Sequence, residues 1–295
     1  MHNPLITVGI PTYNHAKFLA KSVDTATKQT YSNLEIIVVD NYSTDDTDDV
    51  LSRFDDSRIS VIKVNNGGSI AVSRNIILDK ARGEWIAFLD ADDWWDLNKL
   101  NECSHYFREG IDLIYHNLNV VAENKSNLQK KNIKSRKLRK PVFKDLLING
   151  NTIATSSVVV RKSMLSRVNG MNESKEMFGI EDFNAWLKIS QITDGFKLVS
   201  KNFGYYRVHD QNNSNDRKFL PPTEAFMEFL PLLSEKELGA MNSNYNFAAA
   251  RLNFIARNYA FGYKDLISII QKGPLSNRIK AFYMLLVVTL RIRRN

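Results

Sequence analysis

The sequence has a single cysteine, no long apolar run and no stretch near its start that is patterned like a secretory signal. Cys103 is the only cysteine among 295 residues, so an intrachain disulfide is excluded. No stretch reaches the roughly 18 apolar residues that a membrane-spanning helix needs. The first thirty residues lack the basic, apolar and small-residue order of a signal peptide. We therefore expect a cytoplasmic protein without a transmembrane segment.

Acidic residues are absent from two segments, and these segments hold the excess positive charge. The chain has 40 Lys and Arg against 32 Asp and Glu, a formal net charge of +8. Residues 125–144 hold nine basic residues and residues 266–295 hold six, which leaves 25 basic against 32 acidic residues elsewhere. A nucleic-acid surface at 125–144 and a solvated loop are alternative interpretations. Since neither patch has interleaved aromatic residues, we expect no nucleic acid partner.

The N-terminal third alternates strand-like and helix-like segments. Short runs rich in β-branched and aromatic residues occur at 5–10, 34–39, 59–64 and 85–89, and segments of helical length at 15–29, 45–54 and 69–81 separate them. Such alternation predicts an α/β fold with a mostly parallel sheet between helices. Ligands of such sheets bind beyond the carboxyl ends of the strands.

The rest of the chain is less regular. Residues 117–151 are hydrophilic, and we expect a long loop with one short helix there. Further strands are predicted at 153–160, 196–200 and 203–208, and helices at 162–168 and 181–192. Helical patterns continue beyond Pro221-Pro222, so we expect one domain at 1–215 and a helical C-terminal extension at 216–295.

Asp90-Ala91-Asp92 directly follows the fourth apolar run. Two carboxylates at a strand end can bind Mg²⁺ or Mn²⁺, which prefer oxygen ligands and leave positions open for phosphate. The alternative is an acidic turn that caps the helix beginning near Leu97. Trp95 lies just beyond and either stacks on a sugar face or packs internally.

Two other strand ends carry candidate ligand contacts. Asp40 ends the second apolar run, where a carboxylate can accept a hydrogen bond from a ribose hydroxyl or a base N–H, although turn chemistry explains it equally well. Gly67-Gly68 precedes Ser69 and a helix that carries Arg74, a candidate anion or base contact. The glycines match neither the dinucleotide-binding motif nor the P-loop.

Glu181-Asp182 opens an amphipathic helix, and His209 ends the last strand-like run. A carboxylate at this helix start could serve as a general base, or could simply complement the helix dipole. His209 could bind a metal or phosphate, whereas a single histidine is more often a packing residue.

These segments, in this order, resemble the family-two glycosyltransferases of GT-A fold. The resemblance rests on motifs spread over about residues 4–210, namely Pro11-Thr12-Tyr13-Asn14, LEIIVVD (34–40) with Ser43 and Thr44, NGGSIAVSRN (66–75), GEWIAFLDADD (83–93), GIEDFNAWLKI (179–189) and YRVH (206–209). It implies an inverting, metal-dependent hexosyltransferase that takes a nucleotide-diphosphate sugar, most often a UDP-sugar. The acceptor would be a glycan or lipid-linked hydroxyl in bacterial surface polysaccharide synthesis, such as O-antigen.

The resemblance also implies roles for individual residues. Asp182 would be the catalytic base and Glu181 an acceptor contact. Trp95, through the sugar stacking considered above, would be a further substrate contact. Mn²⁺ or Mg²⁺ would be held by Asp90, Asp92 and His209. The nucleotide would be held by Pro11, Thr12, Tyr13, Asp40, Ser69, Arg74, Asp90 and Ala91.

Two alternative functions would also bind a nucleotide through these residues. One is a non-catalytic nucleotide-sugar-binding protein of the same fold; the other is a nucleotidyltransferase, although residues 11–17 lack the glycine- and lysine-rich phosphate loop such enzymes use.

The segment Ala281–Leu290 is apolar, has basic residues on both sides, and is too short to span a bilayer. It is either a core-packed helix or an interfacial helix that makes peripheral contact with the anionic inner face of the cell membrane.

Overall fold

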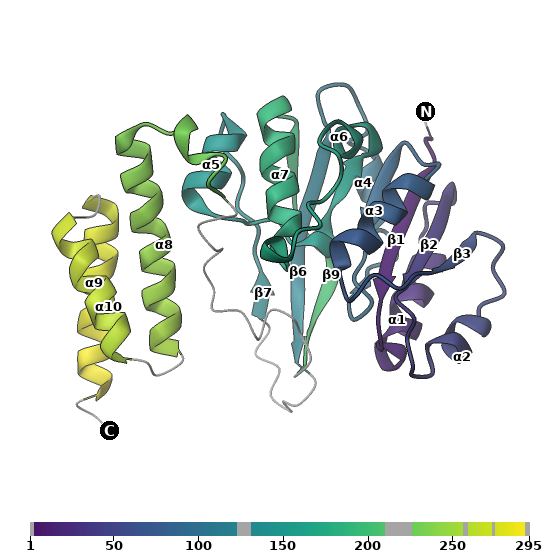
Figure 1. The fold of residues 1–295 in the computed structure, drawn as a ribbon, viewed down its shortest axis with the longest axis horizontal. Coiled ribbons are helices and arrows are strands. Elements are labelled where there is room, and N and C mark those ends of the chain that lie inside the picture. Colours follow the sequence, from purple (N-terminus) through teal and green to yellow (C-terminus); the bar gives the residue numbers. More distant parts are fainter. Residues whose placement is uncertain (1–2, 123–130, 210–225, 256–258, 273–274, 293–295) are drawn as a thin grey trace. The chain divides into compact units, whose positions relative to one another are not determined.

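The structure is a computed structural model that describes residues 3–122, 131–209, 226–255, 259–272 and 275–292. The described strands form one nine-stranded mixed sheet in the order β3-β2-β1-β4-β8-β6-β9-β5, with β7 paired to β6 (Figure 1). The strands are β1 (Ile6–Thr12), β2 (Leu34–Asp40), β3 (Ile59–Lys63), β4 (Trp85–Phe88), β5 (Trp94–Trp95), β6 (Leu113–Ala122), β7 (Lys131–Ile133), β8 (Val159–Arg161) and β9 (Phe196–Val208).

Helices alternate with the first strands and then dominate the C-terminal part. The α-helices are α1 (Ala16–Thr27), α2 (Thr47–Ser52), α3 (Ile70–Lys80), α4 (Lys99–Ser104), α5 (Val142–Asn149), α6 (Lys162–Arg167), α7 (Glu181–Ile192), α8 (Glu235–Ile255), α9 (Tyr259–Lys272) and α10 (Leu275–Ile292). Short 3₁₀ helices occupy Thr155–Ser157, Lys175–Met177 and Leu230–Leu232.

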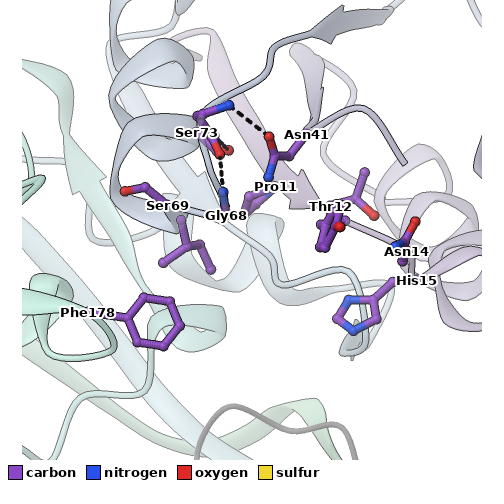
Figure 2. Close-up of a pocket in the computed structure, with 12 residues that line it drawn as sticks. Pro11, Thr12, Asn14, His15, Asn41, Gly68, Ser69, Ser73 and Phe178 are labelled. Carbon is purple, nitrogen blue, oxygen red and sulfur yellow. Dashed lines mark hydrogen bonds between the residues drawn. The ribbon is translucent and has the colours of Figure 1, made fainter. Parts of the chain in front are cut away.

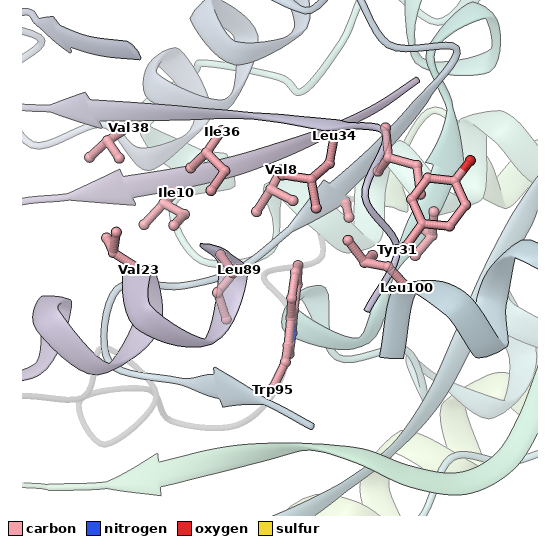
Figure 3. Close-up of a cluster of buried hydrophobic side chains, with 14 of the residues drawn as sticks. Val8, Ile10, Val23, Tyr31, Leu34, Ile36, Val38, Leu89, Trp95 and Leu100 are labelled. Carbon is pink, nitrogen blue, oxygen red and sulfur yellow. The ribbon is translucent and has the colours of Figure 1, made fainter. Parts of the chain in front are cut away.

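Strands β1 to β4 are mutually parallel, which confirms the predicted α/β architecture. Every residue of β1 and β2 is buried, because helices cover both faces of a parallel sheet. Val8 and Ile10 point to the side where α1 packs its Val23 (Figure 3). Gly9 points to the opposite side, where a Cβ atom would lie 2.5 Å from Cγ2 of Ile77, so α3 packs directly on β1.

The other half of the sheet brings distant segments together. β8 runs antiparallel to β4 and β6, while β6 and β9 are parallel with a register shift between His116 and Leu118. β5 pairs antiparallel with β9, so that Trp94 lies opposite Tyr205. This pairing places the loop after β4 beside the end of β9, where His209 lies.

Three predictions about this half are wrong in detail. Residues 117–122 continue β6 and residues 131–133 form β7, where a loop was expected, because these polar residues pair with β9 and with each other. The strand expected at 153–160 is shortened to β8, since Ser157 and its neighbours form a 3₁₀ turn in which the Ser157 hydroxyl donates to the Ala154 carbonyl. The two strands expected at 196–208 are one strand, β9.

The described residues group into two compact units. The first takes its members from residues 1–143 and 152–215, and the second from 144–151 and 216–295. The second unit therefore includes most of α5 along with α8 to α10. The expected boundary between residues 215 and 216, and the Pro221-Pro222 pair, lie outside the described residues. Among the described helices, none has both the length and the apolar character to cross a membrane.

Candidate active site

A cavity of about 420 Å³ opens at the carboxyl ends of β1 and β2 (Figure 2). Its lining comprises Pro11, Thr12, Tyr13, Asn14, His15, Asn41, Asn66, Gly68, Ser69, Ile70, Ser73 and Phe178. A second cavity of about 670 Å³ shares Ser69 and Phe178 with the first and reaches Glu181. Four predicted nucleotide contacts, Pro11, Thr12, Tyr13 and Ser69, thus line the same cavity.

The loops around the first cavity are held by side-chain hydrogen bonds. The Asn14 N–H donates to Oγ of Ser43 at 2.8 Å, and the Thr44 N–H donates to Oδ1 of Asn14 at 2.7 Å. These bonds tie the loop after β1 to the loop after β2. Asn14 has a φ of 51°, a left-handed conformation that asparagine tolerates better than most residues. Asn14 therefore joins the two loops that form this wall of the cavity.

Asp40 is fully buried beside this cavity. It precedes Asn41 in the sequence and pairs with Thr12 across the sheet, and both of these residues line the cavity. Its Oδ1 atom accepts hydrogen bonds from the N–H and hydroxyl of Ser43, at 3.1 and 2.5 Å. Its Oδ2 atom is buried and has no hydrogen-bond partner among the described residues, and the same is true of Thr12 Oγ1. Buried polar atoms in proteins nearly always have a partner, so both atoms are candidate ligand contacts.

Arg74 joins two of the predicted acidic motifs. Its Nη1 atom lies 2.9 Å from Glu181 Oε1, and its Nη2 atom lies 2.8 Å from Asp90 Oδ1. The Arg74 side chain is 3% exposed, so its pair with Glu181 is shielded from solvent, whereas the Asp90 side chain is 29% exposed. Burial lowers the pKa of Arg74, but the neighbouring carboxylates outweigh burial and raise the pKa above its ordinary value. Arg74 is therefore a permanent cation at the centre of the site.

Glu181 and Asp182 begin α7 and have raised pKa values. Burial is the main cause for both, and Arg74 acts in the opposite direction by lowering both pKa values. Asp182 accepts a 2.6 Å hydrogen bond from the Thr155 hydroxyl through Oδ2. Glu181 Oε2 is buried without a hydrogen-bond partner among the described residues. A carboxylate with a raised pKa is better matched to accepting a proton near neutral pH.

The Asp90-Ala91-Asp92 loop is held from both sides. The Ser22 hydroxyl of α1 donates to the carbonyls of Ala91 and Asp93 at 2.7 and 2.5 Å. On the other side, the Asp90 N–H donates to Oγ of Ser156 at 3.1 Å. This backbone anchoring leaves the Asp90 and Asp92 side chains to face the site, with exposed fractions of 29% and 15%.

Asp92 and His209 meet across 117 residues of sequence because β5 pairs with β9. Asp92 Oδ2 and His209 Nε2 lie 3.0 Å apart. Arg207 donates through Nε to the Asp92 carbonyl at 3.1 Å, and its guanidinium lies between the Phe18 and Trp94 rings, 4.8 and 4.6 Å from their centroids. Arg207 thus binds the backbone of the loop that carries Asp92.

The donor chemistry of this corner fits a divalent cation. A carboxylate oxygen and an imidazole nitrogen suit Mn²⁺, and carboxylates also suit Mg²⁺. Burial, followed by the charges of Asp92 and Asp90, raises the pKa of Asp93 well above its ordinary value, which shows that carboxylates crowd here. Across the described ranges, however, no three His, Cys, Asp or Glu side chains form a complete ligand set. Asp90 pairs with Arg74 instead of joining Asp92 and His209.

Two predicted contacts have side chains in the core. Trp95 is 2% exposed, its Nε1 donates to the Ser156 carbonyl at 2.7 Å, and Lys99 Nζ lies 3.3 Å from the centre of its ring. The expectation that Trp95 stacks on a sugar is therefore wrong, because its ring is buried. Ala91 is also 2% exposed within the core cluster, so only its backbone can reach a ligand.

Three further residues of the site, Phe178, Thr155 and Ser156, were not predicted from the sequence. Phe178 is 46% exposed at the edge of both cavities, opposite His15 in Figure 2. Thr155 and Ser156 lie inside a stretch that was expected to be a strand, yet they bind Asp182 and the Asp90 backbone. A run of Thr and Ser within an apolar segment was the available hint.

Residues 7–168 match the glycosyl transferase family 2. The chain is 33% identical over 210 residues to the Escherichia coli UDP-Glc:alpha-D-GlcNAc-diphosphoundecaprenol beta-1,3-glucosyltransferase WfaP, an alignment that covers 70% of this chain and 78% of that protein. It is 31% identical over 224 residues to E. coli WfgD, a glucosyltransferase described by the same activity, covering 74% and 82%. The chain belongs to glycosyl transferase family 2.

Solved structures confirm the GT-A fold. Staphylococcus aureus TarS 1-349 in complex with UDP-GlcNAc has a TM-score of 0.63 at 19% identity, covering 92% of this chain and 82% of that one. The mannosyltransferase PcManGT from Pyrobaculum calidifontis, in complex with GDP-Man and Mn²⁺, has a TM-score of 0.64 at 17% identity, covering 100% and 82%. Family membership makes the chain a glycosyltransferase and disfavours a nucleotidyltransferase.

Proposed function

We propose that the protein transfers a sugar from a UDP-sugar, with inversion, to a hydroxyl of a lipid-linked glycan in bacterial surface polysaccharide synthesis. Relatives described as UDP-glucose transferases acting on a diphosphoundecaprenol-linked sugar support this donor and acceptor class. We further propose that residues 1–215 form the catalytic domain and residues 216–295 a helical extension. The family match within residues 7–168 supports this division.

The donor assignment rests on two buried side-chain atoms at the strand ends that have no hydrogen-bond partner within the described part of the chain. Asp40 Oδ2 is an acceptor that suits the N3–H group of uracil, and Thr12 Oγ1 can donate to a neighbouring carbonyl. Cytosine has no hydrogen at N3, so its N3 lone pair would face the Asp40 carboxylate without a hydrogen bond between them. Pro11, Tyr13 and Ser69 complete the nucleoside cavity, whose volume of about 420 Å³ suits one nucleoside.

The diphosphate would lie toward Asp90 and Asp92. We propose that Asp92 and His209 hold Mn²⁺ or Mg²⁺, and that Asp90, whose Oδ1 pairs with Arg74, contributes to the cation site from the same loop. When bound, the cation would stabilise the negative charge that develops on the leaving diphosphate. Arg207 would keep this loop in place through its bond to the Asp92 carbonyl.

Asp182 is the proposed base. It would take the proton from the acceptor hydroxyl while that oxygen attacks the anomeric carbon, a single displacement that inverts the anomeric configuration. The Thr155 hydrogen bond would fix the orientation of the carboxylate. Glu181, fixed by Arg74 through Oε1, would use its unpartnered Oε2 to accept a hydrogen bond from an acceptor hydroxyl.

A lipid-linked acceptor places the reaction at a membrane. We therefore propose that the protein works at the cytoplasmic face of the cell membrane, through peripheral contact with anionic lipid. The basic, acid-free segment 266–295 supports this location.

A thermal-shift panel of UDP-, GDP-, CDP- and dTDP-sugars, each with and without Mn²⁺, tests the donor assignment. We expect UDP-sugars to raise the melting temperature, and Mn²⁺ to increase that shift, because a ligand that binds only the folded state stabilises it. Stabilisation by CDP-sugars equal to that by UDP-sugars would refute the assigned role of Asp40.

A further inference from the structure

Helix α10 has one face buried in the second unit. Ala281 is fully buried in a cluster with Ala250, Leu266 and Ile269, and Met284 and Leu285 pack against that cluster. Asn277 is 3% exposed and donates to Ser243 Oγ at 3.0 Å and to Asn244 Oδ1 at 2.7 Å. This face is a core contact, as the core-packed interpretation of the segment expected.

The opposite face of α10 is apolar and exposed. Its residues and exposed fractions are Leu275 (71%), Ile279 (62%), Phe282 (58%), Tyr283 (69%) and Leu286 (49%). At about 100° of rotation per residue, these five side chains fall within an arc of about 100°, roughly opposite Ala281 and Met284. A helix of a soluble monomer normally turns such a stripe inward, so this exposed stripe marks a binding surface.

Basic residues flank the stripe on both sides. On the same helical geometry, exposed Arg278 falls at one edge of the arc and exposed Lys280 at the other. The segment 266–295 contains no acidic residue at all. An apolar stripe between basic flanks is the pattern of a helix that lies in the headgroup region of an anionic bilayer, where Tyr283 can anchor at the interface.

We propose that the α10 stripe, Leu275, Ile279, Phe282, Tyr283 and Leu286, is the docking surface that holds this enzyme on anionic membranes. The inference deepens the proposed function, because it names the residues that would bring the active site to a lipid-linked acceptor. A second copy of the chain is the rival occupant. A symmetric dimer through this stripe would bring Arg278 and Lys280 of both copies together without any acidic residue from this segment to pair with them.

The stripe differs from the segment that the sequence singled out. Ala281–Leu290 as a whole is not the interfacial element, because Ala281 and Leu285 belong to the core face and the stripe begins earlier, at Leu275. Arg293 and Arg294 lie outside the described residues. Deleting the segment would remove core contacts as well, so exposed point substitutions are the sharper test.

The test is co-sedimentation of the full chain with vesicles, with no donor or acceptor present. The stripe variant combines Ile279→Ser, Phe282→Ser and Leu286→Ser. A matched control combines Val61→Ser, Leu97→Ser and Leu232→Ser, which are also exposed apolar positions. A charge variant combines Arg278→Gln and Lys280→Gln. Vesicles of phosphatidylcholine with phosphatidylglycerol are compared with phosphatidylcholine alone.

We expect the wild type and the control to bind the anionic vesicles, and the stripe variant to bind at least about tenfold more weakly. The charge variant should bind the phosphatidylglycerol vesicles more weakly than the wild type, with a smaller difference between the two kinds of vesicle. Wild-type binding by the stripe variant would overturn the inference. So would a wild-type dimer that the stripe variant converts to monomers without any vesicle binding.

Calorimetric titration of UDP into each variant separates this inference from the proposed function. All variants should bind UDP like the wild type, since none alters the strand-end cavity. Failure of every form to bind UDP would refute the donor assignment while leaving vesicle binding as the test of the stripe.

Discussion

Replacing Asp40 by Asn should reverse the base preference of the donor site. Ser43 donates two hydrogen bonds to Asp40 Oδ1, so the side-chain amide introduced by Asp40→Asn must keep its carbonyl oxygen at that position. The amide NH₂ group then takes the place of Oδ2, which in the wild type is buried and accepts no hydrogen bond from any residue that the structure describes. A hydrogen-bond acceptor at the base site becomes a donor.

The size of the effect follows from one charge-assisted hydrogen bond. Losing the bond from the uracil N3–H, and facing that group with another donor, should cost about 2–3 kcal/mol. UDP should therefore bind roughly 30- to 150-fold more weakly. CDP should bind better to the variant than to the wild type, because N3 of cytosine accepts from the new NH₂ group.

Isothermal titration calorimetry with UDP and CDP measures both changes. Asp46→Asn is the matched control, since it removes the same charge from an exposed aspartate of the same loop region. It should leave both affinities unchanged. UDP affinity in Asp40→Asn within twofold of the wild type would refute the assignment of Asp40 to the base.

Four further predictions concern charged residues of the site and the core. Asp182→Asn should lower the transfer rate by about 10²- to 10⁴-fold and leave UDP affinity unchanged, whereas a non-catalytic binding protein would have no transfer to lose. In the wild type, the acidic limb of the pH profile of kcat/KM should lie above the ordinary aspartate pKa of 3.8, because burial raises the pKa of Asp182. Arg74→Met should move this limb to still higher pH, because it removes the cation that lowers the pKa of Asp182. Arg207→Gln should raise the Mn²⁺ concentration needed for half-maximal activity by about 10- to 100-fold, with a smaller change in kcat at saturating Mn²⁺. If the variant and the wild type need the same Mn²⁺ concentration, Arg207 does not position the Asp92 loop. Lys99 is fully buried, and burial lowers its pKa from 10.5 to about 7. Between these pH values the unfolded chain binds one more proton than the folded chain, so the free energy of unfolding should rise by roughly 2 kcal/mol from pH 7 to pH 9. Measured by chemical denaturation, Lys99→Met should lack this rise and should be more stable than the wild type at pH 7.

The parallel half of the fold was predictable because its signals are local. β1 to β4 are short apolar runs bounded by polar strand ends, and α7 begins and ends at the predicted residues, Glu181 and Ile192. The residues after these strands lie together because parallel strands end at one edge of a sheet. That rule, applied to the sequence, already brings Thr12, Asp40 and Ser69 to one region.

The rest depends on pairings between distant segments. The polar residues 117–122 become a strand only because β9 lies beside them, and no local pattern shows that partner. Whether Trp95 faces a ligand or the core depends on Lys99 and Ser156, which lie on other elements. The Arg74 ion pairs with Asp90 and Glu181 were likewise invisible, although all three residues had been singled out individually.

The central claim is a single displacement in which Asp182 activates the acceptor and a UDP-sugar is the donor. The most direct measurement is proton NMR of the product formed, in the presence of Mn²⁺, from the UDP-α-sugar that the thermal-shift panel selects and a diphosphate-lipid-linked glycan analogue. The account predicts a β-linked product in the wild type and none above background in Asp182→Asn. An α-linked product, or equal product formation by the variant, would contradict it.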